Sequence, residues 1–382
     1  MAAYTLIATA AMGVEALVAK EIRNLGFTNV KVDNGKITYE SDALGIARSN
    51  VWLRTADRVK LLVGEFPATT FEELFEQTKA LPWAEILPKN AEFPVIGKSV
   101  KSKLYSVPDC QAIVKKAIVE SLKAKYNLSW FEENGATYRI EVALHKDIAT
   151  LSIDTSGAGL HKRGYRYLHN NAPLKETLAS AMIMLTNWTY EKPFIDPFCG
   201  SGTIPIEAAL IGQNIAPGLN RSFASQQWRH IIPQTDWKRA EEEANDLAKR
   251  DRKLEIIGTD IDHKMIELSK TNAKQAGVLD AITFKQMQVK DFHPKQDGGY
   301  IVCNPPYGER IGERKQVEQL YKDMGKTFRK NPTWSVYVLT SNERFEKLYG
   351  KKATKKRKLY NGNIKTYYYQ FFGKPVKKME ND

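Results

Sequence analysis

The sequence predicts an α/β protein whose carboxyl-terminal part is a mostly parallel sheet covered by helices, preceded by two smaller α/β regions. Apolar strand-like runs alternate with helical stretches between about residues 192 and 341, and this alternation is typical of a parallel sheet with helices on both faces. Asn361-Gly362 then lies between two strand-like runs, which indicates an antiparallel hairpin at one edge of that sheet. Residues 66–155 mix strands and helices without a glycine-rich nucleotide loop or a catalytic cluster. This region therefore resembles a binding domain.

Composition favours a soluble protein with a polyanionic partner. The 382 residues are too many for one ordinary core, and 57 Lys and Arg against 44 Asp and Glu give a formal net charge of +13. Such a surplus suits nucleic acid or an anionic membrane surface. No apolar run reaches the ~18 residues needed to cross a bilayer. The three cysteines contain no CxxC pair, so a reducing cytoplasm is the simplest setting.

The apolar amino terminus raises the question of a signal peptide. It lacks a basic first segment, and Val14, Leu17, Val18 and Ile22 recur at helical spacing. We therefore expect a strand followed by an amphipathic helix. Residues 1–65 continue in the order strand, helix, strand, strand, helix, strand, with a hairpin turn at Asp33-Asn34-Gly35, which predicts a small ferredoxin-like domain.

Residues 66–155 form the second predicted domain, with helices at 69–81 and 109–126 followed by two strand-like runs. The third domain spans residues 156–382. Its first helix has Asn171 as a candidate cap and Pro173 in its first turn. The expected strands and helices after it are, in chain order, 192–198, 203–212, 254–262, 263–277, 281–288, 300–306, 317–330 and 334–341. Residues 216–253 interrupt the alternation, and we interpret them as an insertion on the rim of the sheet.

A glycine-containing loop directly follows the first strand of the third domain. Gly200 and Gly202 let the backbone pass close to a ligand, and the next helix offers unpaired N–H groups. Asp196 lies at the carboxyl end of the strand, where open α/β sheets bind ligands. A carboxylate there would repel the pyrophosphate of a dinucleotide, whereas it suits an ammonium or sulfonium group. This favours S-adenosylmethionine as the cofactor.

Two later carboxylates lie where a nucleoside could be bound. Asp260 ends the second strand and can accept hydrogen bonds from both ribose hydroxyls. Asp291 follows the third strand and could accept from an adenine amino group. Taken alone, Asp260 could equally be a solvated strand end.

The fourth strand ends in Asn304-Pro305-Pro306-Tyr307. Two prolines cannot donate to a sheet ladder, so the strand must stop there. The free side-chain oxygen of Asn304 and the carbonyl of Pro305 would hold the two hydrogens of an exocyclic amine. Tyr307 offers an aromatic face for a flipped base. A rigid structural turn is the alternative interpretation.

These motifs, together with HKRGYR and APLKETLA upstream, resemble the THUMP-domain class I RNA methyltransferases, in particular the RlmL-like group, whose members are often labelled N6-adenine-specific DNA methylases. The resemblance implies a Rossmann-like class I methyltransferase domain behind ferredoxin-like and THUMP domains. It implies that Asn304, Pro305 and Tyr307 are catalytic. The residues that it implies for cofactor binding are Lys175, Glu176, Thr177, Asp196, Phe198, Cys199, Gly200, Gly202, Thr203, Asp260, Ile261, Asp291, Phe292 and Asn304.

In RlmL-like enzymes the target amine is guanine N2 in large-subunit ribosomal RNA, so the resemblance implies 23S ribosomal RNA, or an assembling large subunit, as partner. We expect no membrane partner. The candidate RNA-binding residues are Lys98, Lys101, Lys103, His161, Lys162, Arg163, Arg166 and Arg310. For any single lysine, a solvated surface is the alternative. The densest basic run is KKATKKRK, from Lys351 to Lys358.

Several other functions remain open at this point. The amine-binding motif also fits an N6-adenine methyltransferase acting on DNA or RNA, or a tRNA guanine-N2 methyltransferase. A non-catalytic RNA-binding factor and a small-molecule methyltransferase are further alternatives. A cysteine nucleophile at Cys199 or Cys303 is disfavoured, because the Asn-Pro-Pro-Tyr motif offers amine acceptors. The six histidines show no metal-ligand spacing, so no metal is expected.

Overall fold

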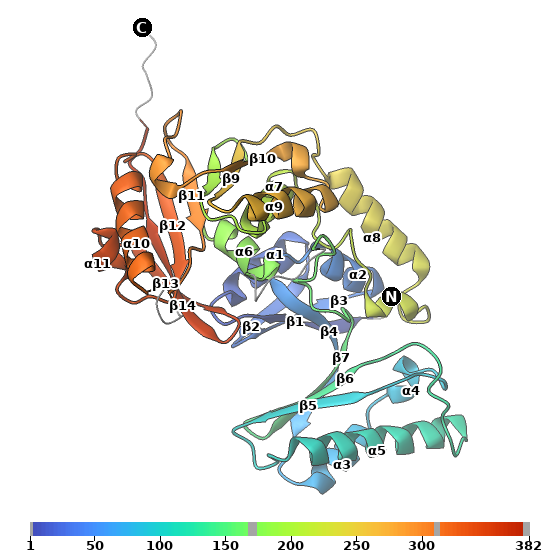
Figure 1. Cartoon of the computed structure of the whole chain (residues 1–382). Helices are drawn as coiled ribbons and strands as arrows, with labels where there is room; N and C mark the ends of the chain where they lie inside the picture. The colour runs from blue at the N-terminus through green and yellow to red at the C-terminus, as the bar shows by residue number, and fades with distance from the viewer. Residues whose placement is uncertain (1–2, 167–173, 309–313, 377–382) are drawn as a thin grey trace. The chain divides into compact units, whose positions relative to one another are not determined.

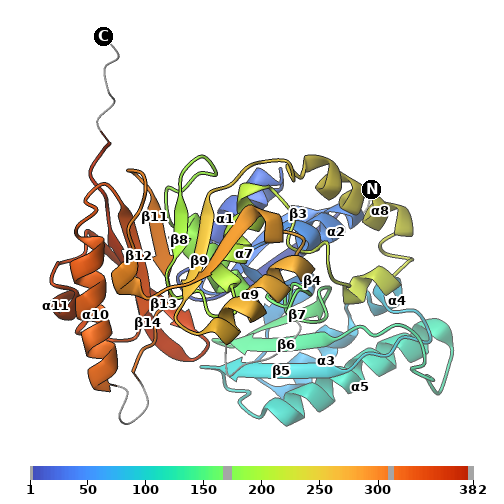
Figure 2. The same ribbon diagram turned by 45° about the horizontal axis from the view of Figure 1, so that its top comes forward.

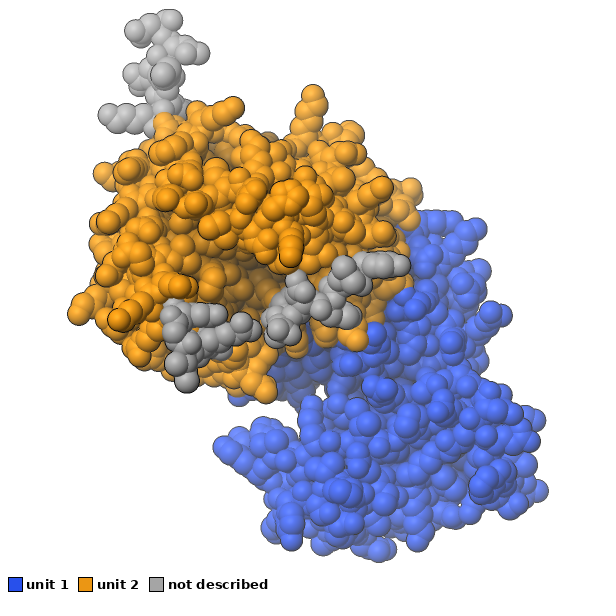
Figure 3. Space-filling model, in the orientation of Figure 1, with its two compact units in different colours: residues 1–10, 18–160, 222–243 blue, residues 11–17, 161–221, 244–382 orange. Residues whose placement is uncertain are grey.

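The computed structural model describes residues 3–166, 174–308 and 314–376. The chain forms two compact units, each built from separate stretches of sequence (Figure 3). Unit 1 contains residues 1–10, 18–160 and 222–243, and unit 2 contains residues 11–17, 161–221 and 244–382. None of the helices in the described ranges is both long enough and apolar enough to span a membrane.

Unit 1 is built on a seven-stranded sheet in the order β2-β3-β1-β4-β7-β6-β5 (Figure 1). Its strands are β1 (Tyr4–Ala10), β2 (Thr28–Asp33), β3 (Lys36–Ser41), β4 (Ala56–Pro67), β5 (Val95–Val100), β6 (Ile140–His145) and β7 (Ile148–Asp154). The helices in this part of the sequence are α1 (Glu15–Asn24), α2 (Ala43–Trp52), α3 (Phe71–Lys79), α4 (Trp83–Ile86) and α5 (Val107–Tyr126). The expected strand and helix at the amino terminus are therefore present.

Local sequence signals explain where several of these elements begin. The Asp42 side chain accepts a hydrogen bond from the Gly45 N–H at the start of α2, and Thr70 and Glu73 form a reciprocal capping box at the start of α3. Gly35 has a φ of +74° between the paired strands β2 and β3, which a hairpin turn requires. The hairpin turn expected at Asp33-Asn34-Gly35 is therefore present.

The two predicted amino-terminal regions share one sheet. Strand β4 is 12 residues long and pairs with β1 on one side and with β7 on the other. The boundary expected between residues 65 and 66 therefore falls inside β4 rather than in a linker.

Residues 222–243 belong to unit 1, which differs from the rim insertion expected in the catalytic sheet. This segment, here called the arm, contains the short helix η1 (Ala224–Gln227) and most of α8 (Gln234–Leu247). The ring of Trp228 is fully buried and stacks on Tyr138 with centroids 4.6 Å apart. Its indole N–H donates to the Thr137 carbonyl at 3.1 Å. A buried aromatic anchor thus holds the arm in unit 1.

Unit 2 contains the second seven-stranded sheet, in the order β10-β9-β8-β11-β12-β14-β13. The first five strands in this order are parallel, and β14 runs antiparallel between β12 and β13. The mostly parallel sheet with a terminal antiparallel hairpin is therefore confirmed. Its strands are β8 (Phe194–Asp196), β9 (Ile256–Asp260), β10 (Ile282–Gln286), β11 (Tyr300–Cys303), β12 (Ser335–Thr340), β13 (Lys355–Asn361) and β14 (Ile364–Phe371).

Helices cover both faces of this sheet (Figure 2). On β14, successive side chains point to opposite faces: Tyr369 packs in the core cluster with residues of α10 and α11, whereas the Tyr368 hydroxyl donates to the Met182 carbonyl of α6. The helices and short turns of unit 2 are α6 (Glu176–Met184), α7 (Thr203–Gly212), α9 (His263–Gln275), η2 (Leu279–Ala281), η3 (Val289–Asp291), α10 (Arg314–Phe328) and α11 (Phe345–Tyr349). The helix cap expected at Asn171, and Pro173, lie outside the described residues.

Candidate active site

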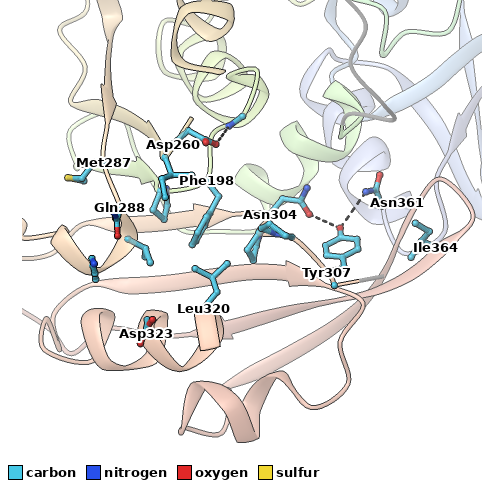
Figure 4. A pocket seen from close by; sticks show the side chains of 18 residues that line it. Phe198, Asp260, Met287, Gln288, Asn304, Tyr307, Leu320, Asp323, Asn361 and Ile364 are labelled. Atoms are coloured by element: carbon cyan, nitrogen blue, oxygen red, sulfur yellow. Dashed lines mark hydrogen bonds between the residues drawn. The ribbon is translucent and has the colours of Figure 1, made fainter. Parts of the chain in front are cut away.

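Unit 2 holds a cavity of about 730 Å³ at the carboxyl ends of its parallel strands (Figure 4). Four strands that are neighbours in the sheet, β10, β9, β8 and β11, each deliver residues to it. Helix α10 and the turn of the β13–β14 hairpin complete the wall. The lining residues are Pro197, Phe198, Gly200, Asp260, Ile261, Met287, Gln288, Val289, Lys290, Asn304, Pro305, Pro306, Tyr307, Gly308, Leu320, Asp323, Asn361 and Ile364.

A second cavity, of about 220 Å³, adjoins the first and shares Phe198, Gly200 and Asn304 with it. Its other lining residues are Leu174, Asp196, Cys199, Ser201, Thr203, Ile204 and Met265. The glycine loop and the Asn-Pro-Pro-Tyr turn, which are about a hundred residues apart in the sequence, therefore share one continuous site. The hypothesis drawn from the sequence needs these two loops in one site, so that a methyl group could pass from a bound cofactor to an amine held by the Asn-Pro-Pro-Tyr turn.

The glycine loop is shaped by its two glycines. Gly200 and Gly202 have φ values of +51° and +86°, and a Cβ on Gly202 would lie 2.9 Å from the Ser269 Cβ, so a side chain there would clash as well as strain the backbone. The Gly200 N–H donates to Asp260 Oδ2 at 3.0 Å, and the Asp262 N–H donates to Asp260 Oδ1 at 3.0 Å. These contacts fix the Asp260 carboxylate at the cavity wall, with further acceptor capacity on each oxygen for hydroxyl groups.

Asp196 lies beneath this loop and is 1% exposed. Its Oδ1 accepts a hydrogen bond from the Phe198 N–H at 3.0 Å. Burial raises the pKa of this carboxyl group well above its ordinary value, and the nearby Asp260 raises it further, although the Phe198 N–H favours the ionised form. A cationic ligand group in the adjoining cavity would supply the positive charge that this carboxylate lacks.

The proposed amine-binding turn is tied to the hairpin. The Tyr307 hydroxyl donates to Asn304 Oδ1 at 2.6 Å, and Asn361 Nδ2 donates to the Tyr307 hydroxyl at 3.4 Å (Figure 4). The sequence suggested that the side-chain oxygen of Asn304 is free, but in the structure it already accepts this hydrogen bond from Tyr307. It retains a second lone pair for a substrate N–H, and the tyrosine hydroxyl fixes which end of the amide faces the cavity.

Two predicted adenine contacts do not line either cavity. Asp291 is exposed, and Phe292 is buried in the core against Phe328 and Trp334. The chain leaves β10 through the η3 turn, so that the residues from Met287 to Lys290 face the cavity instead. The predicted role of Phe292 is therefore wrong, because its ring belongs to the core.

The predicted residues at the start of α6 lie beside the site rather than in its wall. Glu176 and Thr177 are buried, and Leu174 takes the lining position. Glu176 Oε1 is 3.1 Å from Arg166 Nε. Burial raises the pKa of Glu176 to about 7, an effect that the Arg166 guanidinium partly offsets. Lys175 is the residue preceding the helix and is exposed.

Two arginines predicted to bind RNA are internal instead. The Arg163 side chain is 2% exposed and pairs with the fully buried Glu207 at 3.4 Å. Arg166 contacts Glu176 and donates to the Leu174 carbonyl and to Thr203 Oγ1. The two guanidiniums thus brace the loop before α6 against α7, and their prediction as RNA contacts is wrong.

Of the other predicted RNA contacts, His161 is half-buried, and burial beside several cations lowers its pKa to about 4, so that it is uncharged at neutral pH. Lys162, Lys101 and Lys103 are exposed. Lys98 Nζ is 3.0 Å from Glu141 Oε1 in unit 1. Arg310 lies outside the described residues.

Neither cysteine at the site has the environment of a nucleophile. Cys199 and Cys303 are buried, and burial raises the pKa of both thiols, with the Asp196 charge adding to the effect. A thiolate is the reactive form of cysteine, so both side chains are held unreactive.

Sequence reasoning missed several wall residues. Pro197 and Met287 directly follow strands and could have been found by extending the strand-end rule by one or two residues. Asn361 could not, because nothing in the sequence links a hairpin turn to a cavity residue 54 positions earlier.

Comparison with known families agrees with this geometry. Residues 163–370 match the family described as the RMKL-like methyltransferase domain. This chain belongs to the RMKL-like methyltransferase family. In front of that domain, residues 5–60 match the RlmL ferredoxin-like domain and residues 68–154 match the THUMP domain.

Individual relatives of this RMKL-like chain match 94% to 100% of its length. It is 60% identical to YpsC of Bacillus subtilis (strain 168), named a putative RNA methyltransferase, over 100% of both chains. It is 32% identical to ribosomal RNA large subunit methyltransferase K/L of Shewanella sp. (strain MR-4), over 94% of this chain and 51% of the relative. The chain therefore spans about half the length of that relative.

Two solved structures are also close to this RMKL-like protein. One, from Listeria monocytogenes, is described as a predicted N6-adenine-specific DNA methylase and has 58% identity and a TM-score of 0.94, covering 98% of this chain and 97% of the other. The other, SMU.472 complexed with S-adenosylhomocysteine, has 48% identity and a TM-score of 0.93, covering 99% and 100%.

Proposed function

We propose that this protein transfers a methyl group from S-adenosylmethionine to the exocyclic N2 of a guanine in 23S ribosomal RNA. The observation that carries the proposal is the continuous site that joins the glycine loop to the Asn-Pro-Pro-Tyr turn. At a coarser level, the chain is a methyltransferase of the RMKL-like family. The target base and the RNA are the parts that the proposal adds.

The residues of the site fit S-adenosylmethionine. Asp196 is buried and accepts a hydrogen bond from the Phe198 N–H, and its carboxylate suits the cofactor's ammonium and sulfonium charges. Asp260 suits the ribose, and the wall from Met287 to Lys290 suits the adenine. The solved relative with S-adenosylhomocysteine supports this choice of cofactor. When bound, S-adenosylmethionine supplies an electrophilic methyl group and a sulfonium leaving group.

The chain's own contribution at the acceptor is orientation. Asn304 Oδ1 and the Pro305 carbonyl, both at the cavity wall, would hold the two hydrogens of the amine and direct its lone pair toward the cofactor side. The Tyr307 ring would stack on the flipped base. No strong base is required, because positioning can supply a large part of the barrier reduction.

Support for RNA comes from the THUMP match and from the relatives named as RNA methyltransferases. The choice of guanine N2 rests on the resemblance to RlmL-like enzymes. N6-adenine methylation of DNA is the main alternative, and the description of the Listeria relative favours it. We also propose a cytoplasmic location, which the three buried free cysteines support.

The test is methylation in vitro with isotopically labelled S-adenosylmethionine, offered with deproteinised ribosomal RNA or with genomic DNA, followed by mass spectrometry of the nucleosides. We expect N2-methylguanosine from the RNA alone. Asn304→Ala should lower the rate by about 100-fold or more, because misplacement of the amine by ~1 Å has that effect. Cofactor binding by the variant, measured by calorimetry, is the control. Label in DNA alone, label on adenine, or an undiminished rate in the variant would each contradict the proposal.

A further inference from the structure

One face of the β13–β14 hairpin carries alternating lysines and tyrosines. Cross-strand pairing sets Lys358 opposite Tyr367 and Tyr360 opposite Lys365. Since alternate residues of a strand share a face and paired residues lie side by side, these side chains form one row. We call this row the hairpin face. Its members are Lys356, Lys358, Tyr360, Lys365 and Tyr367.

Contacts within the hairpin face keep cations next to aromatic rings. Lys356 Nζ is 3.9 Å from the Tyr367 ring centroid, and Lys365 Nζ is 5.0 Å from the same ring. Lys358 Nζ is 5.3 Å from the Tyr360 centroid. The lysines are exposed, and both tyrosines are half-buried. Ammonium groups and partly open rings thus alternate along the same surface.

The local charge is strongly positive. From residue 351 to residue 371 the sequence contains six lysines and one arginine but no aspartate or glutamate. A carboxylate from a neighbouring segment reaches the hairpin face, because Glu343 Oε1 lies 3.1 Å from Lys365 Nζ. Within the described part of the chain, neither Lys356 nor Lys358 forms an ion pair with a carboxylate. An anionic polymer would therefore be attracted to this surface.

The hairpin face begins at the cavity. Asn361 and Ile364, from the turn of the same hairpin, line the 730 Å³ cavity, and Asn361 contacts Tyr307 (Figure 4). Tyr360 is the next residue along β13. Lys356 lies five positions before Asn361, or ~17 Å along an extended strand. A nucleic-acid strand with one base in the cavity could thus continue directly onto the hairpin face.

We propose that the hairpin face binds the single-stranded RNA segment that flanks the target base, with phosphates on Lys356 and Lys358 and a neighbouring base stacked on Tyr360 or Tyr367. Cationic grooves with interleaved aromatic rings are the usual means of holding single-stranded nucleic acid. The inference rests on the proposed function for the identity of the strand as RNA. It assigns the contacts outside the cavity, which that function does not specify.

The rival explanation is that the cation–aromatic pairs only stabilise an edge hairpin. Such pairs contribute ~0.5–1 kcal/mol at exposed sites. The rival predicts that removing the lysine charges lowers the melting temperature without changing RNA affinity. The proposal predicts a lower RNA affinity with an unchanged melting temperature.

The experiment compares two double variants of the full-length protein with the same charge change. Lys356→Gln with Lys358→Gln removes two cations of the hairpin face. Lys352→Gln with Lys355→Gln removes two exposed cations from the same basic run but outside that face. The probe is a fluorescent, unstructured oligoribonucleotide of about 12 nucleotides containing one guanine, within the usual range of single-strand site sizes. Affinity is measured by anisotropy at several salt concentrations.

For the hairpin-face variant we expect the slope of log affinity against log salt to fall by about 1.4, since each single-strand phosphate contact contributes ~0.7. The control variant should change the slope by less than half as much, and both variants should melt as the wild type does. Tyr360→Ala should weaken binding by about 5- to 150-fold through lost stacking.

Equal effects of the two lysine variants would overturn the inference, as would a lowered melting temperature with unchanged RNA affinity. Tighter binding of a DNA oligonucleotide of the same sequence would overturn the RNA assignment. If the wild-type protein bound RNA through this face but methylated none, the proposed function would fail while the binding surface stood. The two failures are thus distinguishable.

Discussion

Asp196 is the side chain in which burial and chemistry are most directly linked. It is 1% exposed, and its carboxyl oxygen is satisfied by a backbone N–H rather than by a cation. Burial raises its pKa, so in the free protein the proton is retained to a higher pH than in an ordinary aspartate. A ligand ammonium at this position would favour the ionised form and displace that proton.

Binding of S-adenosylhomocysteine should therefore release a proton, and the affinity should increase with pH until Asp196 is already ionised in the free protein. Asp196→Asn should abolish this release and weaken binding by about 10- to 150-fold, as expected for a lost hydrogen bond between charged groups. Calorimetry in buffers of different ionisation enthalpy measures the proton count. Proton release of equal size in the variant would contradict the assignment.

At this scale the sequence predicted some residues and not others, for physical reasons. Asp196 and Asn304 were predictable because glycines and prolines mark where the chain must leave a strand. Phe292 and Arg163 were not, because charge and aromatic character do not reveal burial. Arg163 reads as a surface cation, yet it faces Glu207 inside unit 2.

At the scale of elements, α6 and α7 are joined by buried charged groups. Glu207 of α7 accepts hydrogen bonds from Tyr165 and Ser180 and pairs with Arg163. Glu176, at the start of α6, pairs with Arg166. Replacing one member of such a network leaves another buried without its partner, which is more costly than the network's net contribution to stability.

The pKa of Glu176, raised from 4.5 to about 7, gives this network a pH dependence. Between these two values the unfolded chain ionises while the native state keeps the proton, so stability falls as pH rises through this range. Glu176→Gln stays neutral throughout. The stability of the wild type relative to the variant should therefore decrease by up to about 3 kcal/mol between about pH 4.5 and pH 7.

Urea unfolding of both proteins across this pH range measures the difference in their stability. The effects of groups that titrate in both proteins cancel in this difference. A difference that does not vary with pH would show that Glu176 is ionised in the native state throughout, held by Arg166.

Most strands and helices were predictable from local sequence features. The spacing of apolar residues indicates the type of element, and glycine, proline and asparagine mark where it ends. The continuity of β4 was not, since a strand that serves two neighbours has the same pattern as two shorter ones. The assignment of the arm to unit 1 could not be predicted either, because it depends on the stacking of Trp228 on Tyr138, which lies 90 positions earlier.

At the scale of the whole molecule, Trp228 anchors a segment that the chain contributes to unit 1 after most of that unit has been completed. Trp228→Ala should destabilise unit 1 by about 3–5 kcal/mol, as removal of a large buried aromatic side chain typically does. Trp130, 79% exposed in the same unit, is the matched control, and its replacement by alanine should change stability by no more than about 0.5 kcal/mol. Denaturant unfolding measures both. Similar values for the two variants would show that the arm is not an integral part of unit 1.

The chain alternates between the two units, since residues 11–17 join the second before residue 18 returns to the first, and residues 222–243 return once more. During synthesis, the first unit cannot be finished until more than half of the polypeptide has left the ribosome. Neither unit is therefore encoded by one uninterrupted stretch of the gene, and producing either unit alone would require joining separate segments of the sequence.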